Sequence, residues 1–315
     1  MLCRTANDLF WLSRYLERAE NLARLLEVGF RIALLPRQGD GHYEEWKSIL
    51  KISGSEHIYL ELYPTHSPQQ IIYYLLFDTR NPSSISSCVS KARQNARAQR
   101  TALTREMWES LNSAWMHFQS INPDDISTDR LPSLLDWIKE QSAAYRGALL
   151  NTILRNDTFY FSQLGTFLER ADNTARILDV KYYVLLPSYE MIGSSVDNLQ
   201  WASILRSVSA HRSYRWVYKD SYRPWKIADY LILNSAMPRS LRACYNEIEH
   251  AIHGLNTTYK DETKKLPTAF ETKHLLEKSS IEEIFQGGLH EFIMDFLVRN
   301  NALGQEISKA YYFNT

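Results

Sequence analysis

One thirteen-residue phrase occurs twice in this chain of 315 residues, with nine of its positions identical. LERAENLARLLEV spans residues 16–28, and LERADNTARILDV spans residues 168–180. In both copies the apolar residues are spaced three and four positions apart, which is the spacing of one face of an α-helix. Two nearly identical helices in one chain favour a fold assembled from two similar halves.

Two further pairs of segments extend the similarity beyond this helix. WKSILK (46–51) matches WASILR (201–206), and YLLFDTRNPSSISSC (74–88) matches YLILNSAMPRSLRAC (230–244). The three pairs occur in the same order and at nearly constant separation, which indicates internal duplication. We therefore expect one half over 1–154 and a second over 155–315, with the two halves sharing a core.

The chain is predicted to be all-α. Glycine and proline are scarce, with 11 and 10 residues, and no stretch shows sustained strand alternation. Each copy of the phrase lies within a longer apolar seam of the kind found in antiparallel helix bundles. The fold expected is a bundle of about ten to fourteen helices in two pseudo-twofold-related halves. The seam residues are Leu9, Leu12, Leu16, Ala19, Ala23, Leu26 and Phe30, and Phe161, Leu164, Leu168, Ala171, Ala175, Leu178 and Tyr182.

Proline, glycine and polar clusters give approximate boundaries for the elements. Pro82 and Pro238 suit the first turn of a helix, where the missing N–H costs nothing. Loops are expected over 36–41, 121–130 and 260–274. Long helices are expected over 82–118, 131–154, 156–186, 238–259 and 279–312, the last broken at Gly287-Gly288.

Composition excludes several classes of protein. Lysine and arginine total 36, as do aspartate and glutamate, so no overall charge draws the chain to nucleic acid or membrane. The start lacks the apolar core of a signal peptide, and charges interrupt every apolar run. Three cysteines do not form a disulfide framework, and Cys88 and Cys244, at matched positions, are interpreted as packing residues. We expect a cytosolic protein without a cofactor or a metal ion.

A charged stripe follows each seam, one position further along the helix. At 100° per residue it flanks the apolar face and should be half buried. One interpretation is a structural ion-pair network, in which removing one partner would cost about 3–5 kcal/mol. In the other, arginines bind a carboxylate or phosphate in a cleft and Glu17 or Glu169 acts as a general base. The stripe comprises Glu17, Glu20, Arg24 and Glu27, matched by Glu169, Asp172, Arg176 and Asp179; Arg18, Asn21, Arg170 and Asn173 lie further around.

Two basic patches lie outside the stripe. HRSYRWVYKDSYRPWK (211–226) interleaves Arg212 and Arg215 with aromatic residues, a pattern that can bind single-stranded nucleic acid. The same pattern arises where arginine stems pack across tyrosine rings, and we favour packing or a small anion. Arg93 and Arg97 share one face of a predicted helix and indicate a solvated face, an anion site or a partner surface.

FWLSRYLERAENLARLLEV, KARQNARAQRTALTREMWESLN and MPRSLRACYNEIEHAI resemble the bacterial alpha-E family, and the resemblance covers essentially the whole chain. It implies a helical protein that works beside circularly permuted ATP-grasp ligases in amide-bond synthesis. A transglutaminase-like peptidase and a peptide substrate are further partners that it implies. The family pattern carries over onto Glu17 to Asn21 and Arg24, onto Glu169 to Asn173 and Arg176, and onto Arg93, Arg97, Arg239 and Ser240.

The chain departs from the family pattern before the repeated phrase. Members often have Gly-Arg there, whereas this chain has Ser13-Arg14 in the first copy and Gly165-Thr166 in the second. A symmetric pair of anion clamps is therefore in doubt, although Arg14 remains a candidate. The leading hypothesis is a non-catalytic partner or substrate-binding subunit of an ATP-grasp-type ligase. The alternatives are an enzyme with a Glu/Arg/Asn site between the halves and an RNA-binding protein.

Overall fold

A computed structural model describes residues 1–34, 42–126, 129–183, 194–219, 222–261 and 266–313. Within these ranges the all-α prediction is confirmed, with fifteen α-helices, one short 3-10 helix and no strand. The predicted loop over 36–41 lies outside the described residues, as do residues 184–186 of one predicted helix. The helices are α1 (Cys3–Ala33), α2 (His42–Ile52), α3 (Glu56–Leu62), α4 (Pro68–Leu76), α5 (Ile85–Ala98), α6 (Arg105–Ser120), η1 (Pro123–Asp125), α7 (Leu131–Thr152), α8 (Asp157–Tyr183), α9 (Ser195–Ser207), α10 (His211–Tyr218), α11 (Pro224–Ile232), α12 (Leu241–Tyr259), α13 (Pro267–Lys278), α14 (Ile281–Gly287) and α15 (Leu289–Ala310).

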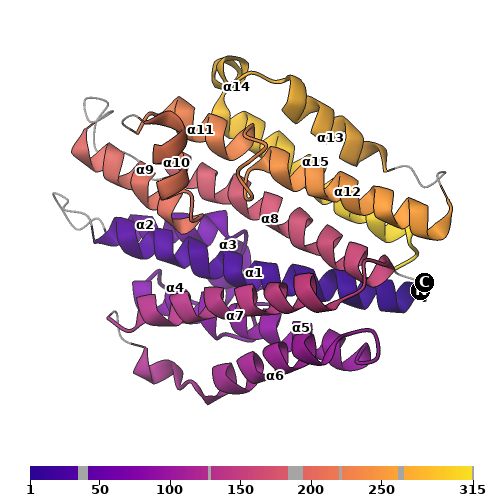
Figure 1. The fold of residues 1–315 in the computed structure, drawn as a ribbon. Coiled ribbons are helices and arrows are strands. Elements are labelled where there is room, and N and C mark those ends of the chain that lie inside the picture. The colour runs from indigo at the N-terminus through magenta and orange to yellow at the C-terminus, as the bar shows by residue number, and fades with distance from the viewer. Residues whose placement is uncertain (35–41, 127–128, 184–193, 220–221, 262–265, 314–315) are drawn as a thin grey trace.

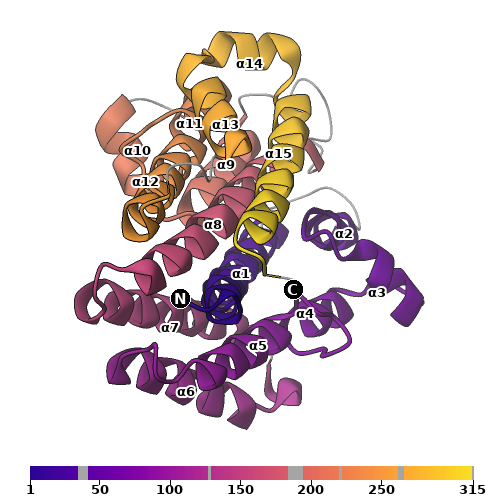
Figure 2. The same cartoon turned by 90° about the vertical axis from the view of Figure 1, so that its right-hand side faces the viewer.

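Helices α1 and α8, which carry the repeated phrase, lie side by side in the middle of the molecule (Figure 1). Helices α5 and α7 pack on α1, and α12 and α15 pack on α8 (Figure 2). The seam residues are buried as far as Leu26 and Leu178, whereas Phe30 is partly exposed and Tyr182 is exposed. The two seams therefore form the centre of a single core.

The directions of the central helices differ in part from the expected antiparallel arrangement. Helix α7 does run antiparallel to α1, with Arg146 beside Glu17 and Lys139 beside Glu27. Helices α1 and α8 instead run in the same direction, both starting at the end where the two chain termini lie (Figure 2). An apolar seam of this period specifies a packing face but not the direction of the partner helix.

Gly165 marks the closest approach of α1 and α8. A Cβ atom at this position would lie 2.2 Å from the carbonyl oxygen of Phe10 and 3.2 Å from the Cβ of Ser13. Only glycine allows the two backbones to come so near, because any side chain would meet backbone rather than a movable side chain. This contact sets the spacing of the two charged stripes.

Three expectations about element boundaries were wrong. The expected helix over 82–118 is two helices, because Thr104 caps α6 by accepting the N–H of Met107. Pro82 and Pro238 precede the helices, whose N-caps are Ser84 and Ser240. The stretch 260–274, expected to be a loop, contains the start of α13 at Pro267, which supplies the pre-set backbone angle of a first turn.

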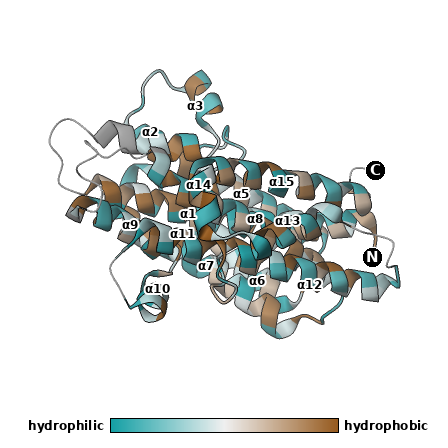
Figure 3. Cartoon of the chain, turned by 90° about the horizontal axis from the view of Figure 1, so that it is seen from above, coloured by the Kyte–Doolittle hydropathy of each residue, from teal (hydrophilic) through white to brown (hydrophobic). Residues whose placement is uncertain are grey.

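The break expected at Gly287-Gly288 is present, since α14 ends at Gly287 and α15 begins at Leu289. No described helix is long and apolar enough to cross a membrane. Along the helices, hydrophilic residues are interspersed with hydrophobic ones (Figure 3). The internal duplication and the division at residue 154 stay predictions.

Candidate functional site: the paired stripes of α1 and α8

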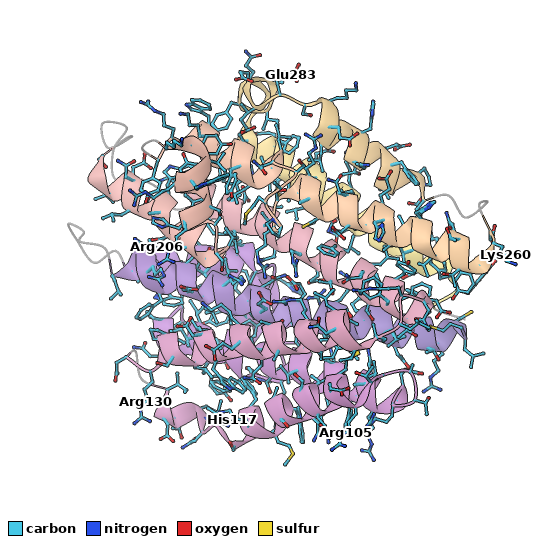
Figure 4. The ribbon with its side chains drawn as sticks, in the orientation of Figure 1. Arg105, His117, Arg130, Arg206, Lys260 and Glu283 are labelled. Atoms are coloured by element: carbon cyan, nitrogen blue, oxygen red, sulfur yellow. The ribbon has the colours of Figure 1, made fainter. Side chains whose placement is uncertain are left out.

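The two Glu-Arg dipeptides of the repeated phrase exchange partners between the central helices. Arg170 on α8 donates through Nε to Oε1 of Glu17 at 2.9 Å. Arg18 on α1 donates through Nε to Oε1 of Glu169 at 2.6 Å. Each glutamate of one copy is thus bound by the arginine of the other, so the phrase forms the interface between α1 and α8. Residues such as Arg105, Lys260 and Glu283 lie instead at the edges of the molecule (Figure 4).

Around Glu17 and Glu20 the stripe forms a closed ionic cluster. Glu20 is 0% exposed and accepts hydrogen bonds from Arg24 at 2.7 Å and from Arg146 and Arg239. Arg239 also donates to Glu17 at 3.2 Å, so one guanidinium bridges both carboxylates. The arginines of this buried cluster, taken together, are Arg24, Arg146, Arg170 and Arg239.

The cluster holds its carboxylates ionised. Burial raises the pKa of Glu20, but the charges of Arg239, Arg146 and Arg24 outweigh it and the pKa falls well below its usual value. Burial lowers the pKa of Arg239, Glu20 and Glu17 raise it, and the net result is a pKa of about 10. These groups exchange no protons near neutral pH, which fits a structural role better than acid–base chemistry.

Around Glu169 the matched stripe opens onto a pocket of about 250 Å³. Arg14 donates to Glu169 at 2.9 Å from the same side as Arg18, and Arg176 binds Asp172 at 2.6 Å. Three arginines therefore face two carboxylates here, which leaves one positive charge uncompensated among the pocket residues. The closed cluster also has an excess of arginine, four for two carboxylates, but only the excess in the pocket is open to a ligand. The pocket is lined by Arg14, Arg18, Asn21, Leu22, Leu25, Ser53, Gly54, Ser55, Leu75, Asn81, Ser83, Glu169, Asp172, Asn173, Arg176 and Asn301.

Two asparagines in the pocket wall have amide atoms without a partner in the part of the chain that the structure describes. Asn21 is 6% exposed and donates through Nδ2 to the carbonyl of Glu169 at 3.1 Å, yet its Oδ1 accepts no hydrogen bond. Asn173 is 5% exposed, and its Nδ2 donates none. Buried polar atoms are nearly always satisfied in folded proteins, because leaving one unpaired costs about 1–3 kcal/mol. The pocket wall thus holds one acceptor and one donor that no described residue satisfies.

The carboxylate in this pocket is a poor general base. Burial raises the pKa of Glu169, but the charges of Arg18 and Arg14 and their hydrogen bonds lower it to about 2. A base works best when its pKa lies near the working pH. Glu17, the other candidate base, is buried, and its pKa is also lowered, since Arg170, Arg239 and Arg146 outweigh desolvation. The lowered pKa values of both glutamates favour a role in binding over proton abstraction.

The lowered pKa of Glu169 gives a pH-dependent contribution to stability. Its folded pKa of about 2 lies below its usual 4.5, so the contribution is full above about pH 4.5 and is lost as the pH falls toward 2. We expect the melting temperature of Glu169→Gln to depend less on pH across this window than that of the wild type. Thermal unfolding followed by circular dichroism at half-unit pH steps measures both slopes. Equal pH slopes for the wild type and Glu169→Gln would contradict the lowered pKa of Glu169.

The closed cluster and the open pocket differ at one matched position. In the matched segments 74–88 and 230–244, Ser83 corresponds to Arg239. The guanidinium of Arg239 fills the space between Glu17 and Glu20, whereas Ser83 is only part of the pocket wall. The space that the arginine occupies on one side is therefore available to a ligand on the other.

The remaining predicted site residues lie away from this pocket. Arg93 donates to Asn112 and stacks 3.9 Å from the ring centre of Trp115, and Arg97 is exposed on α5. Ser240 caps α12 by accepting the N–H of Ala243 at 3.0 Å. These residues contact neither Glu17 nor Glu169.

In the basic patch on α10, Arg212 and Arg215 are exposed beside Trp216, which is 79% exposed. Tyr214 and Tyr218 of the same patch point inward and pack against Tyr230. Most aromatic rings of the pattern therefore belong to the helix packing, as the packing interpretation expects.

Sequence reasoning missed Arg146 on α7 and the Ser53–Ser55 wall of the pocket. Arg146 lies in no matched segment, so no pattern distinguished it from a surface arginine. Cys88 and Cys244 are both buried, and burial raises the pKa of each thiol to about 12. No group of three or more potential metal ligands occurs among the described residues.

The comparisons with known proteins give a family but no function. No curated protein and no solved structure matches the chain. Residues 1–312 match the family model Alpha-E, described as a predicted alpha-helical domain with a conserved ER motif. The Glu-Arg dipeptide occurs in this chain only at Glu17-Arg18 and Glu169-Arg170, the two pairs that exchange partners between α1 and α8. By a match over nearly its whole length, this chain belongs to the Alpha-E family.

Proposed function

We propose that this protein is a non-catalytic, substrate-binding partner of an ATP-grasp-type amide ligase. In this proposal the α1–α8 pocket binds a carboxylate of the ligase's substrate, and the ligase supplies the nucleotide chemistry. The single observation that carries the proposal is the pocket itself, with one uncompensated positive charge and two unpaired buried amide atoms. A transglutaminase-like peptidase is a further partner in the same proposal, acting on the product.

The proposed role needs binding groups rather than proton-transfer groups. Arginine guanidinium groups bind carboxylates through charge-assisted hydrogen bonds, which are about twice as strong as neutral ones. Arg14 uses only its Nε toward Glu169, so its Nη atoms donate to no acceptor among the described residues and can reach a ligand. Glu169 is held by two arginines and serves to fix their orientation.

The ligase proposal is tested with two purified proteins, this chain and an ATP-grasp-type ligase from the same organism. We expect the chain to form a complex with the ligase and to lower its KM for the carboxylate substrate. Arg14→Gln removes a charge-assisted contact of about 1.5–3 kcal/mol, so the KM advantage should fall by about tenfold or more, with kcat unchanged. Steady-state kinetics with and without the chain measure this.

The matched control is Arg93→Gln, which removes another arginine that packs on a tryptophan but lies outside the pocket. It should leave the KM advantage as in the wild type. The proposal is wrong if purified components form no complex and the ligase's KM does not respond to the chain.

A further inference from the structure

We infer that the ligand of this pocket is the carboxyl-terminal end of a peptide, which lies extended in a groove along α8. This inference rests on the proposed function for the pocket's role as a substrate site. It adds the chemical class of the ligand, its direction and the length of chain that the protein contacts.

Two hollows join into one groove. The pocket at Glu169 shares Arg176 and Asn301 with a second hollow of about 220 Å³. Beyond Asp179 the groove ends, because His290 of α15 hydrogen-bonds Asp179 at 2.7 Å and stacks on Tyr182. Helix α15 supplies one wall of both hollows, from Asn301 back to Met294.

The floor of the groove is one face of α8. Residues 169, 173, 176 and 179 recur at steps of three and four, with 172 beside them, and such positions share one side of a helix. Residues 169 and 179 are separated by about 15 Å along the helix axis, at about 1.5 Å per residue. An extended peptide of about four to five residues covers that length. A hexapeptide therefore fills the whole groove.

The two ends of the groove differ in chemistry. The end at Glu169 has the uncompensated arginine charge, which attracts an anion. The other end is bordered by Met294 and Val298 on α15, which are 44% and 66% exposed. This polarity places the charged terminus of a peptide at Arg14 and Arg18 and apolar side chains along α15.

A carboxylate next to an amide fits the charged end better than a free phosphate does. The uncompensated charge is one unit, which a carboxylate neutralises and a phosphate dianion exceeds. Asn21 offers an unpaired acceptor and Asn173 an unpaired donor. A peptide group carries one N–H donor and one C=O acceptor, so the last amide of a peptide satisfies both asparagines.

The test uses the full chain alone and an apolar hexapeptide labelled with a fluorophore at its amino terminus. Fluorescence anisotropy should show binding of the free acid, and the carboxyl-terminal amide of the same peptide should bind about tenfold or more weakly. The carboxyl-terminal dipeptide should also bind more weakly than the hexapeptide, because it lacks the contacts along α15. Millimolar inorganic phosphate should not displace the hexapeptide.

Two pairs of variants locate the binding. Asn173→Asp puts a negative charge in the pocket and should weaken the free acid several-fold, whereas Asn112→Asp, on α6 away from the groove, should not. Val298→Lys should weaken the hexapeptide but not the dipeptide. The control for Val298→Lys is Val217→Lys on α10. Val217 is also an exposed helical valine, at 42%, and its replacement should leave both affinities unchanged.

Each result bears on a separate part of the inference. Equal binding of acid and amide would overturn carboxylate recognition, and displacement by phosphate would show a general anion site instead. Equal affinity of dipeptide and hexapeptide would overturn the groove. Because these measurements use no ligase, failure to form a ligase complex refutes the proposed function and leaves the peptide site standing.

Discussion

Replacing Glu20 with glutamine is expected to lower the free energy of unfolding by about 3–5 kcal/mol, which is the cost of leaving buried charges without their partner. The side chain of Glu20 is 0% exposed and binds Arg24, Arg146 and Arg239 at once. A neutral amide at this position leaves the three guanidinium groups with the carboxylate of Glu17 alone. It also turns an NH₂ group toward donors that cannot accept its hydrogen bonds.

Thermal unfolding measures the effect of Glu20→Gln. For a chain of this length the expected loss corresponds to a melting temperature lower by about 5–8 °C. The matched control is Asp172→Asn, since Asp172 corresponds to Glu20 in the repeated phrase but is 17% exposed and binds Arg176 alone. It should cost about 1 kcal/mol, as a partly solvated pair does. Equal losses for the two variants would mean that the closed cluster is no more stabilising than the open pocket.

The sequence predicts the central helices well but predicts the partners of their charged residues only in part. Helical spacing places Glu17 and Glu169 beside the apolar seam and predicts half burial, whereas both are almost fully buried at the α1–α8 interface. The spacing does not predict which copy of the phrase forms the closed cluster and which lines the open pocket. That outcome depends on Arg146 and Arg239, which reach the cluster from α7 and from the turn before α12, respectively. Contacts between distant segments are not encoded in the period of one helix.

Two of the three errors in the predicted boundaries have a common physical cause. Thr104, Ser84 and Ser240 begin helices through a single side-chain hydrogen bond to the backbone, and each stands in a stretch of ordinary composition. Such a cap stabilises the start of a helix by about 1 kcal/mol, which is enough to set a boundary. A single capping residue does not change the spacing of the apolar residues, so the apolar pattern does not reveal it. Helix α13 was missed because its polar composition resembled a loop, although Leu276 and Ala269 pack into the core.

The spacing of α1 and α8 gives the second prediction with a large effect. Gly165→Ala adds a Cβ atom 2.2 Å from the carbonyl oxygen of Phe10, which is backbone and cannot rotate away. Overpacking costs about 1–3 kcal/mol in general and more where backbone must move. Alanine favours a helix over glycine by about 1 kcal/mol, which offsets only part of this cost. We expect a net loss of about 3 kcal/mol in the free energy of unfolding.

Gly147→Ala is the control for Gly165→Ala, because Gly147 is also within a helix and a Cβ there meets nothing within 4 Å. It should leave stability unchanged or raise it by up to about 1 kcal/mol. If both variants unfold at the wild-type temperature, the close contact at Gly165 is not essential for packing.

The same variant links the packing of the core to the pocket. Glu169 lies one helical turn beyond Gly165 and is held by Arg14 and Arg18 of α1. Pushing the helices apart at Gly165 lengthens these ion pairs and moves Asn21 away from the carbonyl of Glu169. The free-acid hexapeptide should therefore bind Gly165→Ala more weakly than wild type at a temperature where both are folded. Unchanged affinity would show that the pocket keeps its shape independently of the α1–α8 distance.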